Sequence, residues 1–136
     1  SHADAFGLDP VSDGRHPELE RRLSASKPAT LEKVKAASLV PRIATAVEQL
    51  FKQIGCAGAT VAVVVNRVAT AREVRAHLRT KLRDVDVQLV TGRMRPLDRA
   101  ASERELFPRL RSGRERDPAV TPLVVVATQC IEAGAD

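Results

Sequence analysis

The sequence has almost no aromatic residues and few residues that bind metals or form disulfides. It contains no Trp or Tyr and only three Phe. The core must therefore be built from Val, Leu, Ile and Ala, which suits buried parallel strands covered by helices. Cys56 and Cys130 are far apart, without CxxC spacing or a neighbouring His, which excludes a zinc site and a disulfide framework. The three His residues are scattered too, and no metal site is predicted.

Long apolar segments are also missing. The longest apolar runs, residues 61–65 and 123–127, have the length of strands and fall far below the roughly 20 residues that span a membrane. Residues 1–10 lack the basic and apolar regions of a secretion signal. With so little cysteine, these features predict a protein of the reducing cytoplasm.

The standard loops that hold nucleotides are absent. No G-x-x-x-x-G-K-[ST] sequence occurs, and Gly55 and Gly58 precede a predicted strand, whereas a phosphate-binding loop follows a strand and opens a helix. The only carboxylates beyond residue 127 are Glu132 and Asp136, and no His or third acidic residue lies near them in the sequence. The chain alone is therefore predicted to have no catalytic residue.

Length and composition predict one domain preceded by an arm. The chain has 136 residues, of which 43% are hydrophobic, and this suits one compact domain. Residues 1–29 are rich in Pro, Gly and charged residues and indicate an inter-domain linker, which either packs on a neighbouring domain or forms a disordered lead-in. Its first three residues, Ser1, His2 and Ala3, indicate an expression tag. Residues 30–136 are the predicted domain.

Strand and helix patterns alternate along residues 30–136. Runs rich in Val, Ile and Leu predict strands at 60–65, 85–90 and 122–127, and the first is expected to be buried on both faces. A helical pattern precedes each strand. This alternation predicts a three-layer α/β domain with a parallel sheet and right-handed crossovers.

The helices carry their own start and stop signals. Pro41 either kinks the first helical pattern, which runs from residue 30 to Gly55, or opens a second helix. Thr70 and Glu73 form a capping box for the next helix. Pro96 suits the first position of the last helix, and Pro108 is expected to bend or interrupt its end. Helical spacing predicts these inward residues: Val40, Ile43, Val47, Leu50, Phe51, Ile54, Val74, Leu78, Leu97, Ala100, Phe107 and Leu110.

Polar residues follow each predicted strand. Ligands of open parallel sheets bind beyond the carboxyl ends of the strands, where this chain has Asn66 and Arg67, then Thr91, Gly92 and Arg93, then Thr128 and Gln129. These groups suit contacts with a phosphate backbone or a neighbouring domain, although turns favour the same residue types. The net charge of +5 likewise fits either nucleic-acid binding or a solvated basic surface. Arg72, Arg75 and Arg79 are expected on the outer side of their helix.

Three segments resemble motifs of superfamily 2 helicases, in family order and each at a predicted strand exit. VAVVVNR (61–67) resembles motif IV, LVTGR (89–93) resembles the short motif that follows it, and VATQCIEAGAD (126–136) resembles motif V. TGRMRPLDR (91–99) and ATQCIEAGAD (127–136) are most similar to the CRISPR-associated helicase-nuclease of type I systems. LERRLSASKP (19–28) is similar to the segment joining its two motor domains.

The resemblance implies a second RecA-like motor domain of a prokaryotic cytoplasmic enzyme, cut off after its third strand. The parent would use ATP and Mg to translocate on and unwind DNA. The phosphate loop, the Mg-binding motif and the arginine finger would lie outside this chain, so the chain alone is expected to be inactive. The implied contacts with single-stranded DNA are Asn66, Arg67, Thr91, Gly92, Arg93 and Thr128. Gln129 and Glu132 would couple this path to the ATP cleft, and Gly134 and Asp136 would approach the ribose.

The implied partners are single-stranded DNA, the first RecA-like domain of the same parent and a CRISPR surveillance complex. The chain is also expected to self-associate through an open sheet edge. Two alternatives remain at this stage. In the first, the motor belongs to DNA repair or RNA remodelling. In the second, the chain is a free-standing α/β binding or regulatory module.

Overall fold

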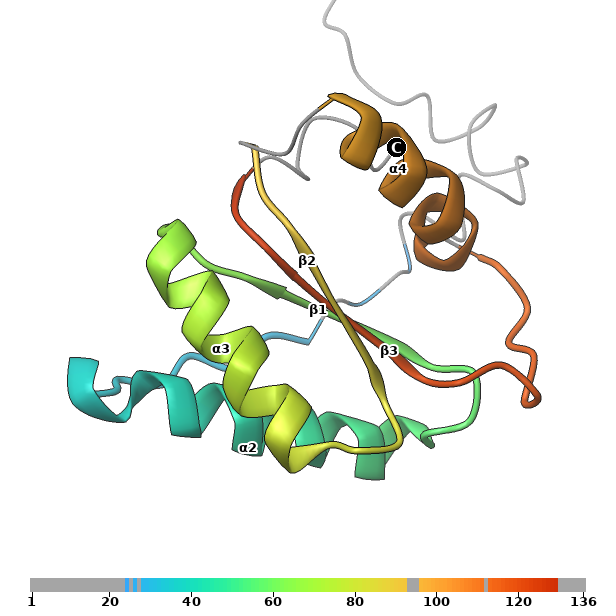
Figure 1. Cartoon of the computed structure of the whole chain (residues 1–136). Helices are drawn as coiled ribbons and strands as arrows, with labels where there is room; N and C mark the ends of the chain where they lie inside the picture. The colour runs from blue at the N-terminus through green and yellow to red at the C-terminus, as the bar shows by residue number, and fades with distance from the viewer. Residues whose placement is uncertain (1–23, 25, 27, 93–95, 112, 130–136) are drawn as a thin grey trace, which may run out of the picture. The chain divides into compact units, whose positions relative to one another are not determined.

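A computed structural model describes residues 24, 26, 28–92, 96–111 and 113–129, and Figure 1 shows its elements. The helices and strands named below all lie in the unit that starts at Val34. A short 3-10 turn, η2 (Ala36–Ser38), leads into α2 (Leu39–Ile54). The chain continues as β1 (Thr60–Val64), α3 (Val68–Lys81), β2 (Asp86–Val90), α4 (Pro96–Leu110) and β3 (Leu123–Ala127). No helix within these described residues is long and apolar enough to cross a membrane.

The three strands form a parallel sheet in the order β1-β3-β2. Thr60 of β1 and Asp86 of β2 both align with Leu123 of β3, and the register continues without a shift to the strand ends. β3 therefore lies between the two earlier strands although it is last in sequence. All five of its residues are buried, as expected for a central strand covered on both faces.

Helices cover both faces of the sheet (Figure 1), with α2 and α3 on one side and α4 on the other. The side chains of β3 alternate between these layers. Val124 and Val126 join the core formed with α2 and α3, whereas Leu123 and Val125 pack with Leu106 of α4. The predicted α/β class with a parallel sheet between helical layers is confirmed, and the arrangement is consistent with a RecA-like fold.

The inward residues of α2 and α3 were predicted in large part. Val74 and Leu78 of α3 are buried, at 1% and 0% exposure, and Val47 and Phe51 of α2 are buried as well. Leu50 and Ile54 were predicted to face inward, but their side chains are 42% and 38% exposed. Leu50 lies at the margin of the apolar stripe, and Ile54 is the last residue of α2.

Several predicted helix ends were wrong. Residues 30–35 are not helical, and α2 begins at Leu39. Pro41 lies in its first turn, where a missing N–H leaves no helical bond unmade. The capping box at Thr70 and Glu73 is not formed, because α3 already begins at Val68, after Arg67 as the N-cap.

Phe107 and the first strand are less buried than predicted. Phe107 of α4 is 46% exposed while its neighbour Leu106 is buried, because Leu106 and Leu110 share the face of α4 that contacts β3. α4 continues through Pro108 and ends two residues later, at Leu110. The first strand is not buried on both faces, since Val64 is 49% exposed. β1 lies at an edge of the described sheet, where α4 does not cover it.

A loop arginine that the sequence did not single out ties the start of β1 to the end of α4. The Arg114 Nε donates to the Arg109 carbonyl at 2.7 Å, and one terminal nitrogen lies 2.8 Å from both the Gly58 carbonyl and the Thr60 hydroxyl. The Arg116 side chain donates to the Ile54 carbonyl, at the end of α2, at 2.7 Å. These guanidinium groups therefore satisfy carbonyls that helix ends and turns leave without a backbone partner.

Candidate functional site

The parallel register places all three strand exits at one edge of the sheet. Val64, Ala127 and Val90, the last residues of β1, β3 and β2, lie side by side in the ladder. The pairing continues one residue further on each side, since the Val65 amide donates to Ala127 at 2.9 Å and the Thr128 amide donates to Val90 at 3.2 Å. The exits thus leave the sheet from a hydrogen-bonded base.

The described site residues differ in their exposure. Of the residues predicted to contact nucleic acid, Asn66, Arg67 and Gly92 are exposed, and Thr91 and Thr128 are half-buried. The predicted coupling residue Gln129 is exposed as well. The structure therefore brings Asn66-Arg67, Thr91-Gly92 and Thr128-Gln129 to the same edge. Four further predicted site residues lie outside the described residues: Arg93, Glu132, Gly134 and Asp136.

Helix α3 starts at this edge without a side-chain cap. Its N-cap residue Arg67 has an extended backbone, with φ −122° and ψ 136°, and its carbonyl accepts the Ala71 amide at 3.0 Å. No acidic residue occupies the first turn. Because the first amides of a helix carry a partial positive charge, an uncapped N-terminus beside a cationic Arg67 favours an anion at this end of the sheet.

The chemistry of the edge is that of binding rather than proton transfer. Hydroxyl, amide, guanidinium and backbone N–H groups all donate hydrogen bonds to phosphate oxygens. No group of three or more His, Cys, Asp and Glu side chains that could hold a metal occurs in the part of the chain that the structure describes. The set of donors suits a phosphate backbone bound without reading base identity.

Sequence reasoning did not identify a second group of arginines, which lies on α3 and just beyond its end. Arg75, Arg79 and Arg83 are spaced by four residues and line one groove together with β2. Arg75 and Arg79 were expected on the outer side of their helix, but Arg83 was not singled out. The four-residue spacing is the only signal that could have linked the three, since it places residues on one helix face.

Comparison with known protein families gives a match. The model of the family described as CRISPR-associated nuclease/helicase Cas3, C-terminal, matches residues 57–136. This segment is more than half of the chain and includes β1, β2, β3 and all three exits. No curated protein and no solved structure gives a significant match. The chain therefore belongs to the family of the C-terminal part of the CRISPR-associated nuclease/helicase Cas3.

Proposed function

We propose that this chain supplies the nucleic-acid-contacting edge of the second motor domain of a CRISPR-associated helicase-nuclease. The parent enzyme would use ATP hydrolysis to move along DNA and unwind it. The observation that carries the proposal is the parallel register, which gathers three polar strand exits beside the uncapped start of α3. The family match favours this pathway over DNA repair, RNA remodelling or a free-standing binding module.

The described exit residues would contact the backbone of single-stranded DNA. Arg67 offers a planar donor fork for one phosphate, and the hydroxyls of Thr91 and Thr128 donate to others. Gly92 has no side chain, so a phosphate can approach its amide closely. Arg93 would extend this row, although it lies outside the described residues. Such contacts give affinity without sequence preference, as a motor that advances along any strand requires.

The same edge would connect DNA movement to the ATP cleft. The Thr128 amide is bonded to the Val90 carbonyl, so the exits of β3 and β2 move together. Gln129 and Glu132 would pass this movement to Gly134 and Asp136, near the ribose. ATP and Mg would be held mainly by the first RecA-like domain of the parent. Three of these four residues lie outside the described residues. A CRISPR surveillance complex would recruit the parent.

Replacing Arg67 by Gln should weaken binding to a fluorescent single-stranded oligonucleotide several-fold at low salt. Removing one phosphate contact should also make the plot of log affinity against log salt less steep by about 0.7. Fluorescence anisotropy across a salt series measures both quantities. Arg104→Gln is the matched control, because Arg104 is exposed on α4 and forms no ion pair or hydrogen bond among the described residues. Equal effects of the two substitutions would contradict the exit-edge interface.

The proposed self-association should use β1 rather than β2. The Ala59 carbonyl accepts the Leu123 amide, and the Val65 amide donates to the Ala127 carbonyl. The backbone groups of the odd-numbered residues in this segment therefore point towards β3. The amides and carbonyls of Thr60, Ala62 and Val64 therefore lie at the edge that has no described strand beside it. At the opposite edge of the sheet, the Arg75 Nε donates to the Val87 carbonyl of β2 at 3.5 Å. The Arg75 side chain therefore occupies part of that edge.

Val64→Lys should therefore shift the chain towards the monomer, because a charge on an edge strand opposes pairing with a second copy. Light scattering across a concentration series measures the mass. Val120→Lys serves as the control, since Val120 is also an exposed valine, at 38%, but lies in a loop. A wild-type chain that is monomeric at every concentration would rule out association through this edge.

A further inference from the structure

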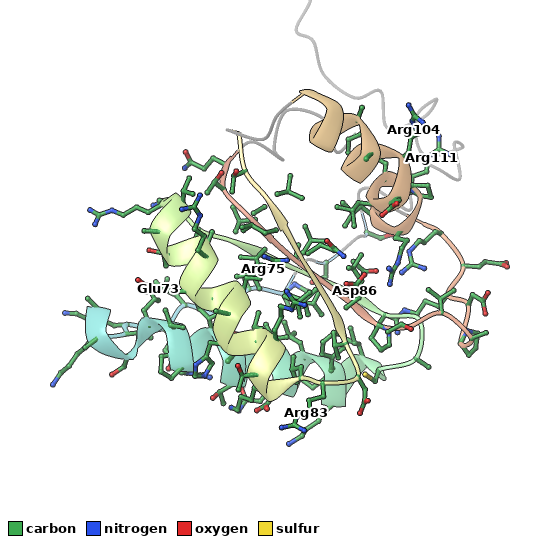
Figure 2. All side chains as sticks on the ribbon, in the orientation of Figure 1. Glu73, Arg75, Arg83, Asp86, Arg104 and Arg111 are labelled. Carbon is green, nitrogen blue, oxygen red and sulfur yellow. The ribbon has the colours of Figure 1, made fainter. Side chains whose placement is uncertain are left out.

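One side of α3 forms a basic groove with the outer edge of β2. The groove has a volume of about 300 Å³, and its polar lining consists of Arg75, Arg79, Arg83, Asp86 and Gln88. Four residues correspond to about 6 Å along a helix, so Arg75 and Arg79 lie about one turn apart on the same face of α3. Arg83 follows just beyond the end of the helix. Figure 2 shows Arg75 between α3 and the strands and Arg83 near the lower end of the helix.

The charge of this groove is not neutralised within the described residues. Arg79 and Arg83 are exposed and make no ion pair or hydrogen bond with any described residue. Asp86 is the only carboxylate in the lining, and it already interacts with Gln88 at 2.8 Å and Arg109 at 3.5 Å. Glu73 lies on the other side of α3 (Figure 2). The lining thus contains three guanidinium groups and only one carboxylate, and that carboxylate already interacts with other residues.

A second arginine-lined hollow, beside β1 and α4, serves as a comparison. It has a similar volume of about 280 Å³, and its lining includes Arg111, whose side chain has no described partner, and three further arginines, Arg109, Arg114 and Arg116. These three side chains donate to backbone carbonyls of Thr121, Gly58 and Ile54, among others. Their donors stabilise loops and helix ends, whereas those of Arg79 and Arg83 have no described acceptor. The α3 groove is therefore the stronger candidate for an external anion.

We propose that the α3 groove binds the phosphate backbone of a nucleic-acid strand, at a place separate from the strand exits. Several guanidinium forks in one groove can bind successive phosphates, and each can bind two oxygens of one phosphate. An extended acidic peptide fits less well, because it would pair with the free edge of β2. The Arg75 side chain already occupies the Val87 carbonyl there.

The groove would extend the path of the same strand. α3 begins at the exit edge, with Arg67 as its N-cap, and its 14 residues end beside the start of β2. A strand leaving the exits could follow α3, which is about 20 Å long, from Arg67 past Arg75 and Arg79 to Arg83. This choice of ligand rests on the proposed function, but the groove is formed by different residues and can be tested by itself.

The test compares two pairs of substitutions that remove the same charge. Arg79→Gln with Arg83→Gln alters the groove, and Arg104→Gln with Arg111→Gln alters α4 and the residue that follows it, away from α3 in Figure 2. Binding of a fluorescent single-stranded oligonucleotide is followed by anisotropy across a salt series. The groove pair should weaken binding several-fold and reduce the salt slope by about 1.4, which corresponds to two phosphate contacts. The control pair should change both much less.

The outcomes separate this inference from the proposed function. If the groove pair behaves like the control pair while Arg67→Gln still weakens binding, the groove is refuted and the exit edge stands. If only the groove pair weakens binding, the proposed contact of nucleic acid with the strand exits is refuted instead. Polyglutamate that displaces the oligonucleotide as well as unlabelled DNA does, at equal charge, would also overturn the assignment to nucleic acid. Arg79→Lys with Arg83→Lys should restore most of the salt slope, because the charge is kept.

Discussion

Replacing Gly58 by alanine is expected to lower the free energy of unfolding by about 3 kcal/mol. Gly58 has a φ of +60°, a conformation that residues with a side chain rarely adopt. An added Cβ would also collide with the Asp117 carbonyl oxygen and lie 2.9 Å from its carbon. Relief of this contact must move the loop that holds the Gly58 amide to the Val120 carbonyl and the Gly58 carbonyl to Arg114.

Urea unfolding followed by circular dichroism measures the loss, with Gly113→Ala as the control. Gly113 also has a positive φ, +73°, but no atom within 4 Å of an added Cβ. Its substitution should therefore cost only the backbone strain, about 1 kcal/mol. If Gly58→Ala were no more harmful than Gly113→Ala, the close approach of the loop at 117 to the turn before β1 would be refuted.

Leu78→Ala should cost about 3 kcal/mol of folding free energy, within the range of large-to-small core substitutions. The Leu78 side chain has no exposed surface and belongs to the core that α2 and α3 form with the sheet. Its removal leaves a cavity that the β-branched residues around it cannot fill without leaving their preferred rotamers. The same urea titration gives the value.

Leu50→Ala provides the comparison for this prediction. It removes the same atoms from a side chain of α2 that is 42% exposed, so the loss should stay below about 1 kcal/mol. The difference between the two leucines isolates the contribution of burial. Similar losses at both positions would mean that α3 does not pack on the sheet as described.

The strands were predictable from local sequence, but their places in the sheet were not. Residues 61–65 and 123–127 are both runs of Val, Leu and Ala, and both predict a strand buried on two faces. Only β3 is buried in this way, because it pairs on both sides, whereas β1 pairs with β3 alone among the described strands. Strand order depends on contacts between distant segments, which a short sequence pattern does not contain.

The exit edge and the α3 groove differ in how far the sequence could predict them. In a parallel sheet every carboxyl end lies at one edge, so three strand predictions sufficed to bring Asn66, Thr91 and Thr128 to the same edge. The groove also requires the packing of α3 beside β2, which sets Arg83 next to Asp86 and Gln88. The contact of Arg114 with Thr60 spans 54 residues, so no local pattern could indicate it.

The central position of β3 has a consequence for synthesis on the ribosome. β1 and β2 are made first, yet each pairs only with β3 in the described sheet. Until residues 123–127 emerge, their backbone groups have no strand partner, and the apolar faces of α2 and α3 can pack only on each other and on unpaired strands. The nascent chain thus presents two open strands until β3 has been made, a state in which chaperones bind and aggregation begins.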